Sequence, residues 1–196
     1  ADPALKVSAS VLTELPTPNI TLVEPVGHVD SGFPSGVSLG GDVNGDGFGE
    51  LAVGALRANA EGLSQSGASY LVAGSQSGPT PGGWGTFGAA DNENKGASAA
   101  LLDINADGFA DLVVGAPGHS GTLPRQGRVQ LYLGSAAGMA TEPAWEYVGV
   151  SENLQLGTLV RNAGDVNGDG REDLVVYAED SVEMFGHLYG FYWQAA

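Results

Sequence analysis

Short apolar segments, each bounded by glycine-rich polar turns, follow one another along the chain. In the middle of the sequence they cover residues 97–102, 111–116, 127–133 and 144–149. Comparable segments lie earlier, at 36–41, 50–55, 67–74 and 83–88, and later, at 158–164, 173–178, 181–186 and 189–194. Their lengths and their flanking Gly, Asn and Asp residues are typical of β-strands, and no segment keeps a helical period. The pattern predicts an all-β protein.

The same order of features returns along the chain at a nearly constant interval. Acidic loops open at Asp42, Asp103 and Asp165, with separations of 61 and 62 residues. Four strands in about 60 residues is the size of one β-propeller blade. Residues 5–12 and 20–27 match the last two strands of a preceding unit. We therefore predict a partial β-propeller with blades of four antiparallel strands, about three to three and a half blades per chain.

This period divides the chain into an N-terminal segment and three repeats. Residues 1–17 carry a strand of a preceding blade, and the repeats cover 18–78, 79–138 and 139–196. Closed propellers have about four to eight blades, so three leave an apolar blade face and sheet edges uncovered. We expect the chain either to associate with itself, most simply as a homodimer, or to be a piece of a longer protein. The aromatic C-terminal residues favour association, unless they form only the third blade's outer strand and core; they are Phe185, Tyr189, Phe191, Tyr192 and Trp193.

Each repeat carries an acidic loop that leads directly into an apolar strand. Oxygen-bearing side chains stand at loop positions 1, 3, 5 and 9, with glycine at position 6. With the backbone carbonyl at position 7, this donor set suits a hard divalent cation of the size of Ca²⁺. The predicted ligands of three Ca²⁺ sites are Asp42, Asn44, Asp46, Phe48 (carbonyl) and Glu50; Asp103, Asn105, Asp107, Phe109 (carbonyl) and Asp111; and Asp165, Asn167, Asp169, Arg171 (carbonyl) and Asp173.

Two other interpretations of these loops can be weighed. EF-hand and dockerin loops share the D-x-N-x-D-G start, but they close with an acidic residue at position 12 and lead into a helix. Here position 12 is Val53, Val114 or Val176, inside an apolar run. Metal-free Asp/Asn/Gly turns would explain one such loop. Three copies with an oxygen donor at every expected position favour calcium, with a structural role in tying neighbouring strands together.

The charge of the chain is consistent with cation binding. Seven Lys and Arg residues stand against 23 Asp and Glu, for a formal net charge of −16. Phosphate backbones and anionic lipid repel such a chain, so neither nucleic acid nor membrane insertion is expected. The sequence has no cysteine, which leaves out a disulfide framework and a thiol nucleophile.

The loop and the strand after it resemble FG-GAP repeats, the blades of the integrin α-subunit head, which also occur in bacterial secreted and surface proteins. Residues Gly115-Ala116-Pro117 keep the terminal tripeptide of the motif, and Gly36, Gly96 and Gly157 are the nearest counterparts of its FG element. The resemblance implies a β-propeller that binds calcium through these loops, on the face opposite the usual ligand surface. It also implies secretion or display on a cell surface.

The favoured function is therefore a non-enzymatic, calcium-stabilised module for extracellular protein recognition or adhesion. A carbohydrate-binding propeller is the alternative, in which Trp84 and Trp145 would serve as sugar platforms rather than in blade packing. Hydrolysis of phosphate esters by clustered acids would need basic residues around the substrate, and few are available. Arg57, Arg125 and Arg128 are predicted to be exposed in loops and are candidate contacts with a partner.

Overall fold

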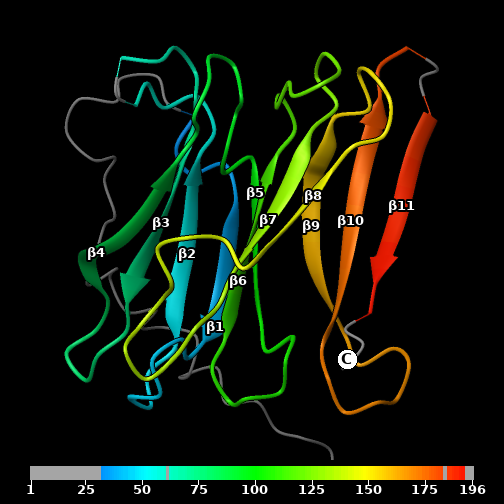
Figure 1. Cartoon of the computed structure of the whole chain (residues 1–196). Coiled ribbons are helices and arrows are strands. Elements are labelled where there is room, and N and C mark those ends of the chain that lie inside the picture. Colours follow the sequence, from blue (N-terminus) through cyan, green and yellow to red (C-terminus); the bar gives the residue numbers. More distant parts are fainter. Residues whose placement is uncertain (1–31, 61, 183–184, 193–196) are drawn as a thin grey trace, which may run out of the picture.

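Three antiparallel β-sheets stand side by side in the computed structural model, which describes residues 32–60, 62–182 and 185–192 (Figure 1). The first sheet has the order β1 (Val37–Gly41), β2 (Glu50–Ala55), β3 (Ala68–Ala73) and β4 (Thr80–Phe87). The second has the order β5 (Ser98–Leu102), β6 (Asp111–Ala116), β7 (Arg128–Tyr132) and β8 (Trp145–Val148). The third consists of β9 (Leu156–Gly164), β10 (Asp173–Asp180) and β11 (Phe185–Phe191), with β10 in the centre. We call these sheets the first, second and third blades. They confirm the prediction of an all-β partial propeller.

The predicted strands of the third blade were wrong at its C-terminal end. Two strands were expected, at 181–186 and 189–194, but one strand, β11, covers Phe185–Phe191. The physical reason is that β10 continues to Asp180 and pairs with β11 without interruption from Leu174↔Phe191 to Asp180↔Phe185. The expected break between the two strands, at His187 and Leu188, lies inside this strand pair. The expected strands at 5–12 and 20–27 lie outside the described residues.

The second blade lies between the other two, and side chains from both of its faces form the core. Leu112 and Val114 on β6 pack toward the first blade, whereas Val113 packs toward the third. This alternation follows from the pleat of a strand, which sends successive side chains to opposite faces. Every residue of β6 is buried, which explains why the residues after Asp111 in this strand form a continuous apolar run.

Pairs of glycines bring the backbones of neighbouring blades into contact. Gly54 in β2 faces Gly96 just before β5, and Gly115 in β6 faces Gly157 in β9. A Cβ atom on Gly54 or Gly115 would overlap the carbonyl oxygen of the glycine opposite. Each of these carbonyls also accepts a hydrogen bond from a serine hydroxyl, at 2.8 and 2.9 Å. The counterparts of the FG element and of the GAP element therefore meet at each interface between blades.

Candidate calcium-binding loops

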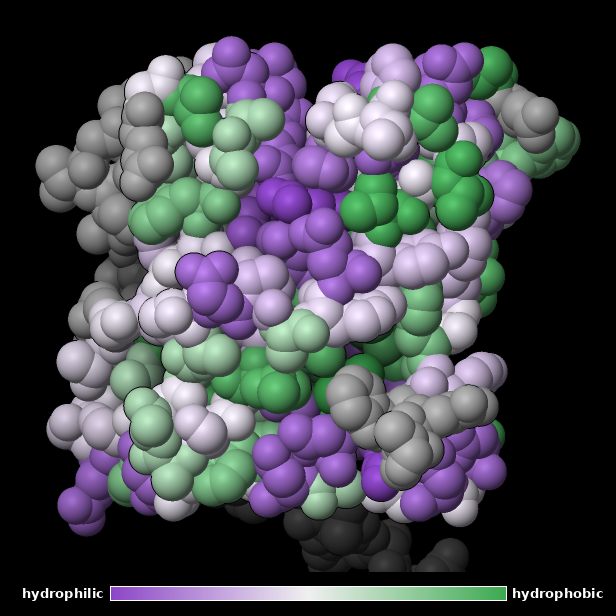
Figure 2. Space-filling model, viewed as in Figure 1, coloured by the Kyte–Doolittle hydropathy of each residue, from purple (hydrophilic) through white to green (hydrophobic). Residues whose placement is uncertain are grey.

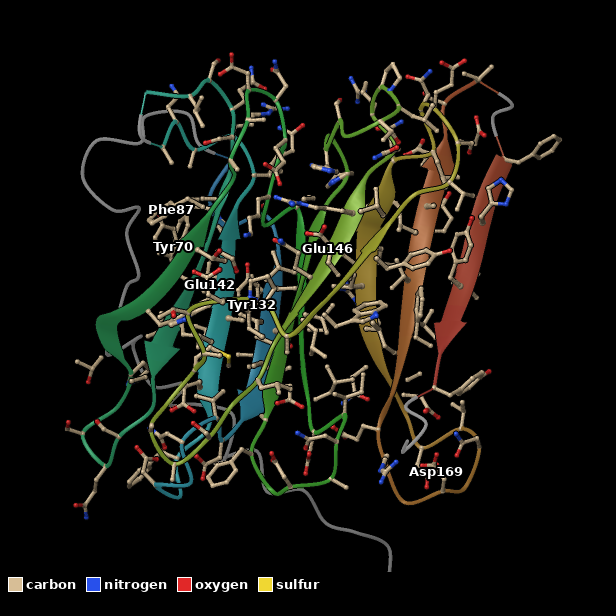
Figure 3. All side chains as sticks on the ribbon, in the orientation of Figure 1. Tyr70, Phe87, Tyr132, Glu142, Glu146 and Asp169 are labelled. Carbon is tan, nitrogen blue, oxygen red and sulfur yellow. The ribbon has the colours of Figure 1, made fainter. Side chains whose placement is uncertain are left out.

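The three acidic loops connect the first and second strands of their blades and lie at the same end of the molecule (Figure 1). They join β1 to β2, β5 to β6 and β9 to β10. Asp169 marks the third loop in Figure 3, at the lower end of the third blade. The repeat thus places one predicted calcium loop on each blade, as expected from the sequence.

The carboxylate at position 1 accepts hydrogen bonds from the backbone N–H groups of its own loop. The N–H of the position-6 glycine donates to it in all three loops: Gly47 to Asp42, Gly108 to Asp103 and Gly170 to Asp165, each at 2.9 Å. These glycines have φ angles of +88°, +90° and +86°, a region that L-residues avoid. The loop backbone therefore wraps around an aspartate oxygen at the same place in every repeat.

Positions 3, 5 and 7 also repeat their contacts. In the first loop the N–H of Asp46 donates to Asn44 Oδ1 at 2.9 Å, and the N–H of Phe48 donates to Asp46 Oδ1 at 2.9 Å. The equivalent distances are 2.9 and 2.9 Å in the second loop and 2.8 and 3.0 Å in the third. The side chains at positions 3 and 5 are also hydrogen-bonded to each other in each loop. The loops thus gather the side-chain oxygens of positions 1, 3 and 5 along a short curved backbone.

The carboxylate at position 9 is buried and joins the loop to its own sheet. Glu50 accepts from the N–H of Val43 at 2.7 Å and from that of Gly74 at 3.3 Å. Asp111 accepts from Ile104 at 3.2 Å and from Gly134 at 3.0 Å. The glutamate at position 50 thus makes the same pair of contacts as the aspartate of the second loop, despite its additional methylene group.

Asp173, at position 9 of the third loop, has one oxygen without a partner. Its Oδ2 accepts from the N–H of Val166 at 2.8 Å, but Oδ1 is buried with no hydrogen bond among the described residues. An unsatisfied buried carboxylate oxygen is costly, and a bound cation would satisfy it. Each carboxylate oxygen that accepts an N–H bond also retains a second lone pair for a metal ion. The donor chemistry of the loops therefore fits Ca²⁺.

Acidic side chains alone do not make a metal site in these loops. No group of three or more His, Cys, Asp or Glu side chains in the described ranges is arranged to hold a metal ion. Ca²⁺ takes six to eight oxygen ligands, and it commonly includes amide and backbone carbonyl oxygens among them. In this chain those would be the asparagine at position 3 and the carbonyl at position 7: Asn44 and Phe48, Asn105 and Phe109, Asn167 and Arg171.

Hydrogen bonding and burial act in opposite directions on these carboxylates. The N–H groups of Gly170, Gly168 and neighbouring residues lower the pKa of Asp165 below its usual value. Burial raises the pKa of Asp111 to about 6, although the N–H groups of Gly134 and Ile104 partly oppose this effect. Position 1 of the third loop is therefore held as an anion, whereas a bound cation would offset the burial of the position-9 carboxylate of the second loop.

Neighbouring loops are in direct contact with one another. The N–H of Ala110 in the second loop donates to the carbonyl of Asp42 in the first, at 2.8 Å. Glu172 in the third loop accepts from the N–H of Asp103 in the second, at 2.6 Å. The role of Glu172 was missed in the sequence, although it replaces the Gly49 and Ala110 of the other loops at position 8. A change in the conformation of one loop can therefore alter the backbone of the neighbouring loop through these hydrogen bonds.

The prediction that Arg128 is exposed was wrong. Arg57 and Arg125 are exposed, but Arg128 lies in β7 with a side chain only 13% exposed. Its guanidinium donates to Glu93, which is almost completely buried, and to Glu146 on β8 at 2.9 Å. Figure 3 labels Glu146. The charge of Arg128 is paired with two carboxylates, those of Glu93 and Glu146. Arg128 therefore links segments within the chain and is not available to contact another protein.

A buried lysine extends this polar network toward the first blade. Lys95 Nζ donates to Thr86 Oγ1 at 2.7 Å and to Tyr132 Oη at 2.8 Å. Burial, together with the nearby Arg128, lowers the pKa of Lys95 to about 8. No sequence pattern indicated this cluster, because Thr86 lies in β4, Tyr132 lies in β7 and Lys95 precedes β5.

Comparison with known protein families identifies the repeat. A profile of the FG-GAP repeat matches residues 33–72 and 95–132. The chain contains FG-GAP repeats. Both matched segments include an acidic loop and the strand that follows it. The third loop lies beyond them, but it makes the same hydrogen bonds, so the geometry of the repeat extends to the third blade.

Curated relatives of this FG-GAP chain fall into two groups. Integrin alpha-4 of Xenopus laevis is 35% identical over 95 residues, which is 48% of this chain and 9% of that protein. Phosphatidylinositol-glycan-specific phospholipase D of Mus musculus is 37% identical over 149 residues, or 71% of this chain and 18% of the enzyme. The Rattus norvegicus protein of the same name is 31% identical over 198 residues, which is 94% of this chain and 23% of that protein. The chain thus spans less than a quarter of the length of each of these relatives.

Proposed function

We propose that this chain is a calcium-binding, integrin-like propeller module with a recognition role outside the cell or at its surface. The observation that carries the proposal is the threefold repetition of one hydrogen-bonding scheme around the side-chain oxygens of the acidic loops. The buried Oδ1 of Asp173, which lacks a partner among the described residues, supports it further. Calcium would be held by the predicted ligands, and its charge would offset the repulsion among the carboxylates of each loop.

The number of sites can be tested by substitution within one loop. The side chain of Asp169 is exposed and hydrogen-bonds only within its loop, so Asp169→Ala should leave the fold intact and remove the third site. We expect calorimetric titration of the metal-free protein with Ca²⁺ to give three sites for the unchanged chain and two for the variant. Glu152→Gln, an exposed acid outside the loops, is the control and should keep three. An unchanged stoichiometry in Asp169→Ala would contradict the assignment.

The proposal assigns no catalytic role to this module. The relatives that cover most of the chain are named as phospholipases D, but the chain corresponds to less than a quarter of their length. Basic residues that could position a phosphate ester are few, with seven Lys and Arg in the whole sequence, and Arg128 is already paired. We expect the purified chain to release no product from a phosphatidylinositol-glycan substrate with or without calcium. Turnover that disappears in Asp169→Ala would overturn the non-enzymatic assignment.

A carbohydrate-binding role is less well supported than recognition of a protein. Trp84 packs against Tyr132 and donates its indole N–H to the carbonyl of Ala140 at 2.9 Å. Trp145 packs edge-to-face on Phe191 in the same way, with ring centroids 5.3 Å apart, so both tryptophans have a packing role.

None of the described segments forms a helix long and apolar enough to cross a bilayer.

We also propose that two copies of the chain associate through their outer blade faces. Leu39 on β1 is 78% exposed, and Leu188 on β11 and Leu159 on β9, which both pair with Tyr177 on the outer face of the third blade, are 72% and 39% exposed. Figure 2 shows apolar side chains, in green, at the surface over the third blade. Contiguous exposed apolar groups on strands favour association, and closed propellers need about four or more blades.

If two copies associate through this face, the mass of the protein in solution should depend on the exposed Leu188. We expect sedimentation velocity to detect a dimer at concentrations on the order of 10 μM and a monomer for Leu188→Lys, because a charge would be buried at the interface. The control Val150→Lys changes a residue that is 70% exposed in a loop, and it should leave the dimer unchanged. A monomer for the unchanged chain would remove this part of the proposal.

A further inference from the structure

Two of the three acidic loops share one sequence but have different surroundings. Gly-Asp-Val-Asn-Gly-Asp-Gly occupies residues 41–47 in the first loop and 164–170 in the third. Each copy contains an Asn-Gly pair, Asn44-Gly45 or Asn167-Gly168, and no other asparagine of the sequence precedes glycine. The second loop has Asn105-Ala106 at the same place. The repeat therefore presents one dipeptide in three settings, two of which differ only in the structure around them.

An asparagine amide next to glycine can react with its own main chain. The backbone nitrogen of Gly168 would attack Cγ of Asn167, and the Cγ–Nδ2 bond would break to leave a cyclic succinimide. Hydroxide takes the proton from the attacking nitrogen, and the departing nitrogen takes a proton from water and leaves as ammonia. Water then opens the ring at either carbonyl, which gives aspartate or its β-linked isomer. Glycine favours this reaction because it has no Cβ to hinder its nitrogen, and the two groups are already neighbours.

The hydrogen bonds around the two Asn-Gly pairs are nearly identical. The N–H of the glycine donates to the aspartate at position 1 at 2.7 Å in both loops. The asparagine oxygen accepts from the N–H at position 5, at 2.9 Å in the first loop and 2.8 Å in the third. The φ angles of Gly45 and Gly168 are +75° and +77°. Neither the backbone shape nor the hydrogen bonding therefore distinguishes the two pairs.

The two pairs differ in what covers the glycine. A Cβ atom on Gly45 would lie 2.8 Å from Cε1 of Phe109, so the ring of the second loop packs on the first. At Gly168 no described residue beyond the chain neighbours has an atom within 4 Å of the same point. Asn167 is also exposed, whereas Asn44 is half-buried. Rearrangement at Gly168 thus breaks only exposed hydrogen bonds, whereas rearrangement at Gly45 must also displace an aromatic ring.

We propose that Asn167 is a site of spontaneous deamidation, at which water converts the side-chain amide to a carboxylate in the folded chain. The product adds a negative charge to the loop between Asp165 and Asp169, and the β-linked isomer also lengthens the main chain by one carbon. Both products change the group that accepts from the N–H of Asp169. The reaction needs only the chain and water, so this inference does not rest on the calcium proposal.

Digestion with trypsin separates the three loops for mass spectrometry. The third loop falls in peptide 162–171, and the others fall in peptides 7–57 and 96–125. The full chain is kept free of calcium in mildly alkaline buffer, at a temperature at which circular dichroism shows it to be folded. Replacement of NH₂ by OH raises the mass of a peptide, and fragmentation locates the residue. We expect Asn167 to react at least about tenfold faster than Asn44, and Asn105 to react slowest.

Denaturation provides the reference for these rates. In concentrated urea Asn44 and Asn167 should react at the same rate, because their neighbours in sequence are identical. The difference between them in the folded chain then measures the effect of the structure alone.

The variant Gly168→Ala tests the role of the glycine. It gives the third loop the Asn-Ala pair of the second, where Ala106 has a φ angle of +59°, so the loop accepts alanine at this position. We expect the rate at Asn167 to fall to that of Asn105, because the new Cβ hinders the attacking nitrogen.

The variant Phe109→Ala tests the role of the covering ring. It uncovers Gly45, and we expect the rate at Asn44 to rise at least about fivefold. The rate at Asn167 in the same sample should stay unchanged, which shows that the variant has not loosened the whole chain.

Three results would overturn the proposal. The first is equal rates at Asn44 and Asn167 in the folded chain. The second is a rate at Asn167 that is no greater than that at Asn105. The third is an unchanged rate at Asn44 in Phe109→Ala, which would mean that the ring does not select between the two pairs.

Discussion

Removal of calcium is expected to lower the melting temperature of the chain by tens of degrees. An ion that binds only the folded state at 100 times its dissociation constant adds about 2.7 kcal/mol per site, and three sites add about 8 kcal/mol. For a chain of this size, 1 kcal/mol corresponds to about 2–4 °C. The empty loops also destabilise the fold, because each holds three carboxylates close together in a chain whose net charge is −16.

Thermal unfolding followed by circular dichroism in chelator and in millimolar calcium measures this effect. Millimolar magnesium is the matched control, because Mg²⁺ demands a strict octahedral site and gives up its water reluctantly. We expect magnesium to restore much less of the stability than calcium does. Superimposable melting curves in chelator and in calcium would mean that the loops do not contribute through a bound ion.

Gly115→Ala in β6 is expected to be strongly destabilising, because the added methyl group has no room between the second and third blades. The new Cβ would overlap the carbonyl oxygen of Gly157 and come within 2.6 Å of Ser98 Oγ. The obstacle is backbone of the third blade, so relief requires the two blades to move apart. Overpacking of this kind typically costs about 1–3 kcal/mol, and contact between two rigid backbones places this substitution at about 3 kcal/mol or more.

Urea denaturation of Gly115→Ala can be compared with that of Gly190→Ala. The comparison distinguishes loss of the Gly115–Gly157 contact from the general effect of replacing a glycine in a strand. Gly190 lies in β11, is exposed, and would place its Cβ 3.2 Å from the mobile end of Tyr192. We expect Gly190→Ala to be close to neutral, because alanine loses less backbone freedom than glycine on folding. Equal denaturation midpoints for the two variants would show that the glycine contact does not limit the spacing of the blades.

The repeat made most of the fold predictable from the sequence. The acidic loops, the strands after them and the assignment of one loop to each blade follow from a pattern that occurs three times. The third blade was less predictable, because the break expected at residues 187–188 lies within one strand, which only the pairing of β10 with β11 reveals. Register is a property of two strands together, and one strand alone does not specify it.

The contacts between blades could not be derived from the pattern. Arg128 was expected to be exposed, and only the fold reveals that buried Glu93 lies opposite it. The apolar hollow lined by Ile104, Trp145 and Phe191 was equally hidden, since each of these residues lies more than forty positions from the next in the chain. Local chemistry thus followed from residue spacing, whereas the pairing of distant side chains needed the three-dimensional arrangement.

The most direct test of the calcium account is a crystal structure of the chain grown with abundant calcium, with anomalous scattering used to locate the ions. We expect three anomalous peaks per chain, one in each acidic loop, with oxygen ligands from positions 1, 3, 5, 7 and 9 at about 2.3–2.6 Å. Loops that hold only water under those conditions would contradict the central claim that calcium neutralises the three acidic loops.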